Sequence, residues 1–199
     1  MLSRKLRIVL LRLVFIPFVA AAVFVGPSWP SESLIDFGVE WLGYLLVLAG
    51  LGVRLWSVVY LGGRKSRELV TEGPYSVCRN PLYWGTTFIA MGAGLCFENV
   101  PMAVCAVLII APAQFLVVRA EERHLKDIFG QQYEKYRNEV PGLLPSFRNY
   151  RSDRYVTVST KAIWRAIMEA MLVVLIPLAG DFVQLVQAKG WVPVIWRFP

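Results

Sequence analysis

Residues 82–97 (LYWGTTFIAMGAGLCF) and 101–118 (PMAVCAVLIIAPAQFLVV) decide the fold of this chain. Both stretches lack charged side chains, and only three residues, ENV, join them. Uncharged apolar runs close to the length of a bilayer core are typical of membrane helices. We therefore predict a helical hairpin. Three glycines in its first arm, Gly85, Gly92 and Gly94, would let a neighbouring helix approach closely.

Three further apolar segments flank this hairpin. Residues 8–26 and 37–61 precede it, and each is long enough to cross the membrane. Residues 162–186 follow it, and Pro177 and flanking charges weaken the pattern, so a fifth span and an interfacial helix both fit. Hydrophobic residues make up 56% of the 199 and charged residues 18%, with a mean hydropathy of +0.51. We predict an all-α integral membrane protein, a bundle of about five transmembrane helices.

The charges predict the orientation. Lys and Arg number 21 against 14 Asp and Glu, a formal net charge of +7. The cations gather in residues 62–79 and 119–161, whereas residues 27–36 contain none. Because basic connections stay in the cytoplasm, we expect the N-terminus and both basic segments there, in a multi-pass protein. This banding favours a membrane protein over a nucleic-acid-binding one. The only histidine, His124, excludes a multi-histidine metal site.

Most of the polar side chains that could form a binding site lie in two short stretches within or beside the basic segments. Residues 68–83 contain two prolines, a glycine, two tyrosines, an arginine and an asparagine, and residues 119–122 read RAEE. Since the hairpin returns the chain to the same membrane face, the two segments should be neighbours, about 10 Å apart. Paired carboxylates beside tyrosine rings suit a cationic, partly aromatic ligand, and an arginine suits an anionic group.

Ordinary structural roles also fit these residues. Glu121 and Glu122 are favourable at the start of a helix, and a polar helix is predicted over about 120–137. Gly130 would loosen that helix, and Val140-Pro141-Gly142 would end it. The arginines could be membrane anchors and the tyrosines interfacial belt residues. The pattern alone leaves a binding site and a structural role equally open.

The order of these motifs resembles that of the isoprenylcysteine carboxyl methyltransferase family, which is similar in turn to membrane phospholipid N-methyltransferases. The family pattern runs from a Gly-x-Tyr through Arg-His-Pro-x-Tyr and a membrane hairpin to a glutamate pair and a Val-Pro. The corresponding residues here are Gly73-Pro74-Tyr75, Arg79-Asn80-Pro81-Leu82-Tyr83, Glu121-Glu122, Leu125, Phe129-Gly130, Tyr133, Tyr136 and Val140-Pro141. The resemblance covers about residues 67–145.

The resemblance implies an integral membrane enzyme that transfers methyl from S-adenosylmethionine to a lipid or lipidated acceptor, with a cofactor site on the cytoplasmic face and no metal. The implied cofactor-binding residues are Arg67, Glu68, Leu69, Val70, Tyr75, Asn80, Pro81, Leu82, Tyr83, Glu121 and Glu122. Arg119 and Glu121 are the implied catalytic residues, and Arg119, Arg54 and Arg79 the candidates to orient an acidic head group. We expect one membrane domain over 1–199, with a methyltransferase-like core at 67–145 and a C-terminal extension at 150–199.

Asn80 departs from the family pattern, which has a histidine there. Asparagine donates and accepts hydrogen bonds but does not titrate, so it suits holding the cofactor and not general-base catalysis. A carboxylate or phosphate acceptor needs no base, which favours an anionic, lipid-like acceptor such as an isoprenylcysteine carboxylate. A phospholipid amine and a small thiol stay open as acceptors.

Two other functions also fit the sequence. One is a sterol-reductase-like membrane enzyme that uses NADPH. The other is a non-catalytic membrane protein whose basic loops bind anionic lipids or a partner.

Overall fold

The computed structural model describes residues 23–26, 33–64 and 67–196. The helical elements named here are α2 (Leu34–Leu61), α3 (Pro74–Val77), α4 (Pro81–Cys96), α5 (Val100–Glu139), η1 (Phe147–Asn149) and α6 (Thr160–Ala188). No strand forms within these ranges, where a parallel bridge joins Val25 to Trp196. The predicted all-α class is confirmed. Most of the predicted span over residues 8–26 lies outside the described residues.

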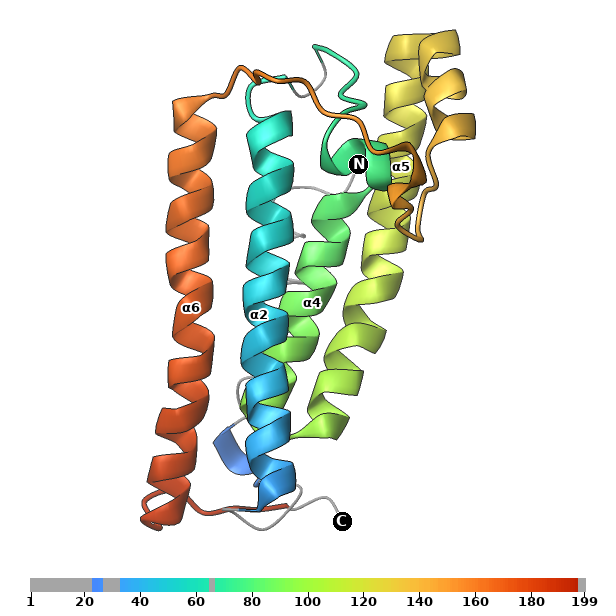
Figure 1. The fold of residues 1–199 in the computed structure, drawn as a ribbon. Coiled ribbons are helices and arrows are strands. Elements are labelled where there is room, and N and C mark those ends of the chain that lie inside the picture. Colours follow the sequence, from blue (N-terminus) through green and yellow to red (C-terminus); the bar gives the residue numbers. More distant parts are fainter. Residues whose placement is uncertain (1–22, 27–32, 65–66, 197–199) are drawn as a thin grey trace, which may run out of the picture.

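The long helices stand side by side in a bundle (Figure 1). α2 packs between α6 and α4, and α4 packs in turn against α5. The C-terminal end of α2 and the N-terminal ends of α4 and α6 point the same way, and the 140–159 segment crosses over that end (Figure 1). The two polar segments that the sequence predicts to be neighbours therefore lie at one end of the bundle.

Among the described residues, three helices are long and apolar enough to cross a membrane: α2, α5 and α6. They contain the predicted spans over residues 37–61, 101–118 and 162–186. α6 has 29 residues and runs alongside α2, which favours a fifth span over an interfacial helix (Figure 1). α4 is shorter, at 16 residues, and forms the predicted hairpin with α5.

Glycines set the close approach of α2 to α4. A Cβ at Gly50 would lie 2.6 Å from the Gly85 carbonyl oxygen, and one at Gly92 would lie 2.7 Å from the Gly43 carbonyl oxygen. Any side chain at these positions would push the backbones apart. Gly94 packs in the same way against Ala103 of α5. The predicted role of the glycines in the first hairpin arm is confirmed.

The polar helix predicted over about 120–137 is not a separate element. Its first part continues the helix of the fourth span, which begins at Val100 and runs as far as Gly130. The helix reverses at Gly130, whose φ of 50° and ψ of −121° are not helical, so residues 131–139 fold back (Figure 1). An ion pair of 2.5 Å between Lys126 Nζ and Glu134 Oε1 bridges the reversal. The predicted weak point at Gly130 is thus the place where the chain turns.

We expect Gly50→Val to destabilise the bundle, because its side chain would meet the α4 backbone. Overpacking of this kind costs about 1–3 kcal/mol. The matched control is Gly52→Ala on the same helix, where an added Cβ meets nothing within 4 Å. Thermal unfolding in detergent should show a lower Tm for Gly50→Val and an unchanged or slightly higher Tm for Gly52→Ala. Equal Tm values for the two variants would contradict this account of the packing.

Candidate functional site

A hydrogen bond between the two predicted segments forms the centre of the candidate site. Tyr83, in the first turn of α4, donates its hydroxyl proton to Glu121 Oε2 on α5 at 2.8 Å. Pro81 and Leu82, beside Tyr83, form the first turn of α4, in which Pro81 is buried. Proline is favourable at this place because the first helical N–H groups have no partner within the helix. The hairpin thus brings residues 38 positions apart in the chain into direct contact.

The second glutamate holds the segment that leads into α4. Arg79 Nε donates to Glu122 Oε1 at 3.0 Å, and Asn80 Nδ2 lies 3.3 Å from the same oxygen. Arg79 Nη1 also donates to the carbonyl oxygens of Arg137 and Val140, at 2.8 and 2.9 Å. A planar guanidinium can serve several acceptors at once. Arg79 therefore joins three parts of the chain.

A glycine lies beside the Arg79 guanidinium. A Cβ at Gly142 would lie 2.5 Å from Arg79 Nη2. The Gly142 carbonyl oxygen accepts a hydrogen bond from Asn80 Nδ2 at 3.3 Å and one from Cys78 Sγ at 3.4 Å. The turn after α5 thus closes over the segment before α4. The role of Gly142 in the site was not predicted from the sequence, where it marked only a helix end.

Tyr75 is buried in the short helix α3, with 8% of its surface exposed. The helix follows Gly73, whose φ of +56° favours glycine and whose missing side chain makes room for the Tyr60 ring. Tyr136 on α5 donates its hydroxyl to the Tyr75 carbonyl oxygen at 2.7 Å. These contacts fix the backbone of Tyr75 from two sides.

The Tyr75 hydroxyl itself is buried and has no hydrogen-bond partner among the described residues. Burial raises its pKa above the ordinary value for tyrosine, and the nearby Glu121 and Tyr83 raise it further. The hydroxyl therefore stays protonated and lies close to the Tyr83–Glu121 pair. A buried polar group without a partner costs about 1–3 kcal/mol, and such groups are rare in folded proteins. This hydroxyl therefore retains an unused capacity to form a hydrogen bond.

The residues before α3 divide into two pairs. Val70 is buried against Tyr75 and Tyr60, and Leu69 packs on the cluster of Tyr133, Tyr136 and Val140. Arg67 and Glu68 are exposed, and Glu68 pairs with Arg64 at 3.6 Å. Of the four predicted loop residues, Leu69 and Val70 thus pack against the aromatic residues of the site.

Two of the predicted arginines and the histidine lie away from these contacts. Arg119 is exposed and stacks over Phe115, 4.2 Å from the ring centroid. Arg54 contacts Thr86 on α4 and Glu169 on α6. His124 is exposed. The substrate roles of Arg119, Arg54 and Arg79 stay predictions.

Two further features belong to the site. The Tyr133 hydroxyl is a second buried group without a partner in the described ranges, and Tyr133 itself is 2% exposed. Gln114 on α5 bonds the Tyr83 carbonyl oxygen at 3.3 Å and the Thr87 hydroxyl at 3.1 Å, which ties α5 to α4 below Tyr83. Tyr133 appears in the sequence motif, but Gln114 is a lone polar residue in an apolar run and was missed.

Comparison with known proteins now supplies the family. The phospholipid methyltransferase family model matches residues 39–132. Protein-S-isoprenylcysteine O-methyltransferase B of Arabidopsis thaliana is 32% identical over 134 residues, which cover 64% of this chain and 68% of the plant protein. The chain belongs to the isoprenylcysteine O-methyltransferase family. The suspected resemblance is confirmed, and the matched residues include Tyr75, Tyr83 and Glu121.

Other relatives in this family carry different names. The nickel-cobalt-cadmium resistance protein NccN of Alcaligenes xylosoxydans is 29% identical over 94% of this chain and 87% of its own length. The cobalt-zinc-cadmium resistance protein CzcN of Cupriavidus metallidurans is 36% identical over 79% of this chain and 73% of its own. In the described part of the chain, no three His, Cys, Asp or Glu side chains form a group that could hold a metal ion. No solved structure is significantly similar to the chain.

We expect Arg79→Lys to destabilise the protein, because one ammonium group cannot reach Glu122 and two carbonyl oxygens together. Breaking a fully buried ion pair costs about 3–5 kcal/mol; this pair is only partly buried and lysine retains the charge, so we expect a loss of about 2 kcal/mol. Arg64→Lys is the matched control, because Arg64 pairs with an exposed glutamate at 3.6 Å. Denaturation in detergent should show a large loss for Arg79→Lys only. Similar stability of both variants would mean that Arg79 does not join the segments as described.

Proposed function

We propose that the protein is an S-adenosylmethionine-dependent membrane methyltransferase, whose cofactor binds between α3, the first turn of α4, and Glu121 of α5. The observation that carries this proposal is the buried, unpartnered Tyr75 hydroxyl beside the Tyr83–Glu121 pair. S-adenosylmethionine is cationic, and its hydroxyl and amino groups can donate hydrogen bonds to a carboxylate. It also carries an aromatic base that suits tyrosine rings.

The residues fit this cofactor in complementary ways. Tyr75 and Tyr83 would position it with hydroxyls and ring faces, and Glu121 would accept hydrogen bonds from its hydroxyl or ammonium groups. Asn80 and Arg79 hold Glu122 and so act as positioning residues. When bound, S-adenosylmethionine supplies a methyl group on a sulfonium sulfur. Leu69 and Val70 would help to keep water out of the site.

The acceptor that fits best is a carboxylate on a lipid-like or prenylated molecule. A methyl transfer of this kind depends mainly on alignment of donor and acceptor, and a carboxylate is already deprotonated. Asn80, which cannot act as a base, is compatible with such an acceptor. A dry site also favours the reaction of an anion with a cation. Arg119 is the candidate to orient the acceptor from the exposed side of α5.

The orientation follows from the charges. We place the site, and the end of the bundle crossed by the 140–159 segment, on the cytoplasmic side, because the basic connections gather there. Residues 67–145 would form the catalytic core, and the extension over 150–199 adds α6 to it. The family match, over residues 39–132, begins before this core and ends before α6 begins.

We expect Glu121→Gln to abolish methyl transfer while the protein still folds. Loss of a charged hydrogen-bond acceptor should weaken cofactor binding by about tenfold to hundredfold. Membranes that contain each variant are incubated with labelled S-adenosylmethionine, and the labelled product is identified by its mass. Glu134→Gln is the control, because Glu134 pairs with Lys126 away from Tyr83. Turnover by Glu121→Gln at the wild-type rate would refute the assignment, and binding of NADPH instead of S-adenosylmethionine in calorimetry would favour a reductase.

Tyr75→Phe provides a second test, in which stability and binding should change in opposite directions. Removing a buried hydroxyl without a partner should raise stability by about 1 kcal/mol. The same change should lower the affinity for S-adenosylmethionine. Tyr136→Phe is the control, because its hydroxyl bonds the Tyr75 carbonyl oxygen, and its loss should lower stability. If Tyr75→Phe leaves cofactor affinity unchanged, the hydroxyl does not contact the cofactor.

A further inference from the structure

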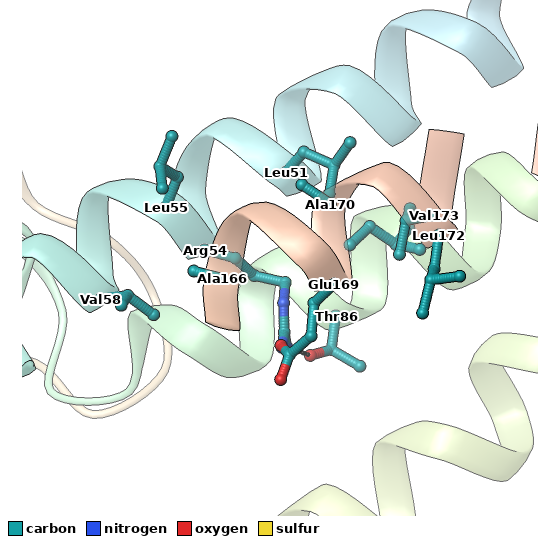
Figure 2. Close-up of a pocket in the computed structure, with 11 residues that line it drawn as sticks. Leu51, Arg54, Leu55, Val58, Thr86, Ala166, Glu169, Ala170, Leu172 and Val173 are labelled. Carbon is teal, nitrogen blue, oxygen red and sulfur yellow. Dashed lines mark hydrogen bonds and ion pairs between the residues drawn. The ribbon is translucent and has the colours of Figure 1, made fainter. Parts of the chain in front are cut away.

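A cavity of about 360 Å³ lies between α2, α4 and α6, on the side of the bundle that α6 covers (Figure 2). Its walls are mainly apolar and include Leu51 and Leu55 of α2, Ile89 of α4, and Ala170 and Val173 of α6. Leu55 is 40% exposed, so the cavity opens toward the outside of the bundle. In a membrane, that opening faces lipid.

An ion pair lies within these apolar walls (Figure 2). Arg54 Nη1 donates to Thr86 Oγ1 at 2.8 Å, and Arg54 Nη2 donates to Glu169 Oε2 at 3.0 Å. A guanidinium has five N–H groups. Within the described part of the chain, Arg54 makes these two hydrogen bonds. The Glu169 side chain is 51% exposed. Arg54 therefore keeps free donors, and its counter-ion lies at the open edge of the cavity.

The depth of the pair is unusual for a structural ion pair. Arg54 precedes the last residue of α2 by seven positions, or about 10 Å along the helix axis. α2 has 28 residues and is about 42 Å long, so a hydrocarbon core of about 30 Å centred on it would include Arg54. Ionisable side chains at such a depth are costly and usually mark a functional site. Arg64, Arg67 and Arg79, by contrast, lie outside the helices.

We propose that this cavity binds a single-chain lipid carboxylate, with the carboxylate on Arg54 and the hydrocarbon chain along Leu51, Ile89 and Val173. A carboxylate matches the planar guanidinium, which can donate two parallel hydrogen bonds to it. A volume of about 360 Å³ is near the lower end of the 300–1,000 Å³ range typical of ligand pockets. It suits one chain with a compact head group better than a two-chain phospholipid.

Glu169 competes with the ligand in this arrangement. It neutralises Arg54 when the cavity holds no acid, and the incoming carboxylate takes its place on the guanidinium. Among the described residues, Arg54 is the hydrogen-bond partner of Glu169, and the Glu169 side chain is half exposed, so it can turn outward. Removing its charge should therefore strengthen the binding of an acid. This is the opposite of what a purely structural ion pair would show.

The cavity lies across α4 from the proposed cofactor site. Thr86 faces Arg54 of α2, whereas its neighbour Thr87 bonds Gln114 of α5. Tyr83, one turn before them, reaches Glu121 of α5. The lipid site is thus a separate site, and the proposal does not rest on methyl transfer.

The test is equilibrium binding of labelled oleate to the full-length protein in a neutral detergent, at a pH at which oleate is ionised and without S-adenosylmethionine. We expect saturable binding to the wild type, and binding about tenfold weaker for Arg54→Gln. Glu169→Gln should bind about tenfold more tightly. Ala170→Phe, which fills the cavity but leaves the ion pair in place, should bind more weakly. Glu134→Gln, the control on α5, should match the wild type.

Size-exclusion profiles and thermal unfolding identify variants that fail to fold. If Arg54→Gln does not fold, Glu169→Gln and Ala170→Phe still test the proposal. Weaker binding by Glu169→Gln would overturn the proposal, because it would mean that the pair acts as a unit or binds a zwitterion. Equal competition by oleyl alcohol would remove the role of the carboxylate. Stronger competition by phosphatidylglycerol than by unlabelled oleate would assign the cavity to a phospholipid instead.

Discussion

The antiparallel pairing of α4 with α5 is the constraint on which the candidate site depends. Tyr83 lies 13 residues before the end of α4, whereas Glu121 lies 21 residues after the start of α5. The two backbones are therefore offset by about 12 Å along the hairpin. Side chains lean toward the N-terminus of their own helix, so in this pair they lean toward each other. The hydrogen bond of 2.8 Å is the result. A buried turn capped by Asn99 holds the register at the other end.

The sequence predicted this core well because lipid restricts what the chain can do. Apolar runs in a bilayer must satisfy their own backbone groups, so they form helices, and short connections make neighbours antiparallel. That reasoning was enough to place residues 68–83 beside residues 119–122. It did not reveal the role of Arg79, whose partners include the carbonyl oxygens of Arg137 and Val140. Those oxygens reach Arg79 only because the chain reverses at Gly130. A lone glycine in the sequence of a polar helix indicates that the helix can bend there, but it does not predict in which direction the chain continues.

Asn80 illustrates how the structure explains a departure from the family motif. Its side-chain amide donates toward Glu122 and toward the Gly142 carbonyl oxygen, both at 3.3 Å. A neutral hydrogen-bond donor is sufficient for these contacts, and no proton transfer is involved. Tyr75 shows the reverse case. The motif predicted that this tyrosine matters, but only the packing of Tyr60 and Val70 around it reveals that its hydroxyl is buried without a partner among the described residues.

α6 changes the chemistry of the bundle as well as its size. Without it, the face of α2 that carries Arg54 would be open to lipid, and a lone guanidinium at that depth would be strongly unfavourable. Glu169 arrives on α6 and neutralises Arg54, while Ala166 and Ala170, one turn apart, leave space beside the pair. Bulkier side chains would have filled that space and buried the ion pair completely. The small residues instead keep the charges within reach of the bilayer, so the helix that stabilises Arg54 also leaves it accessible.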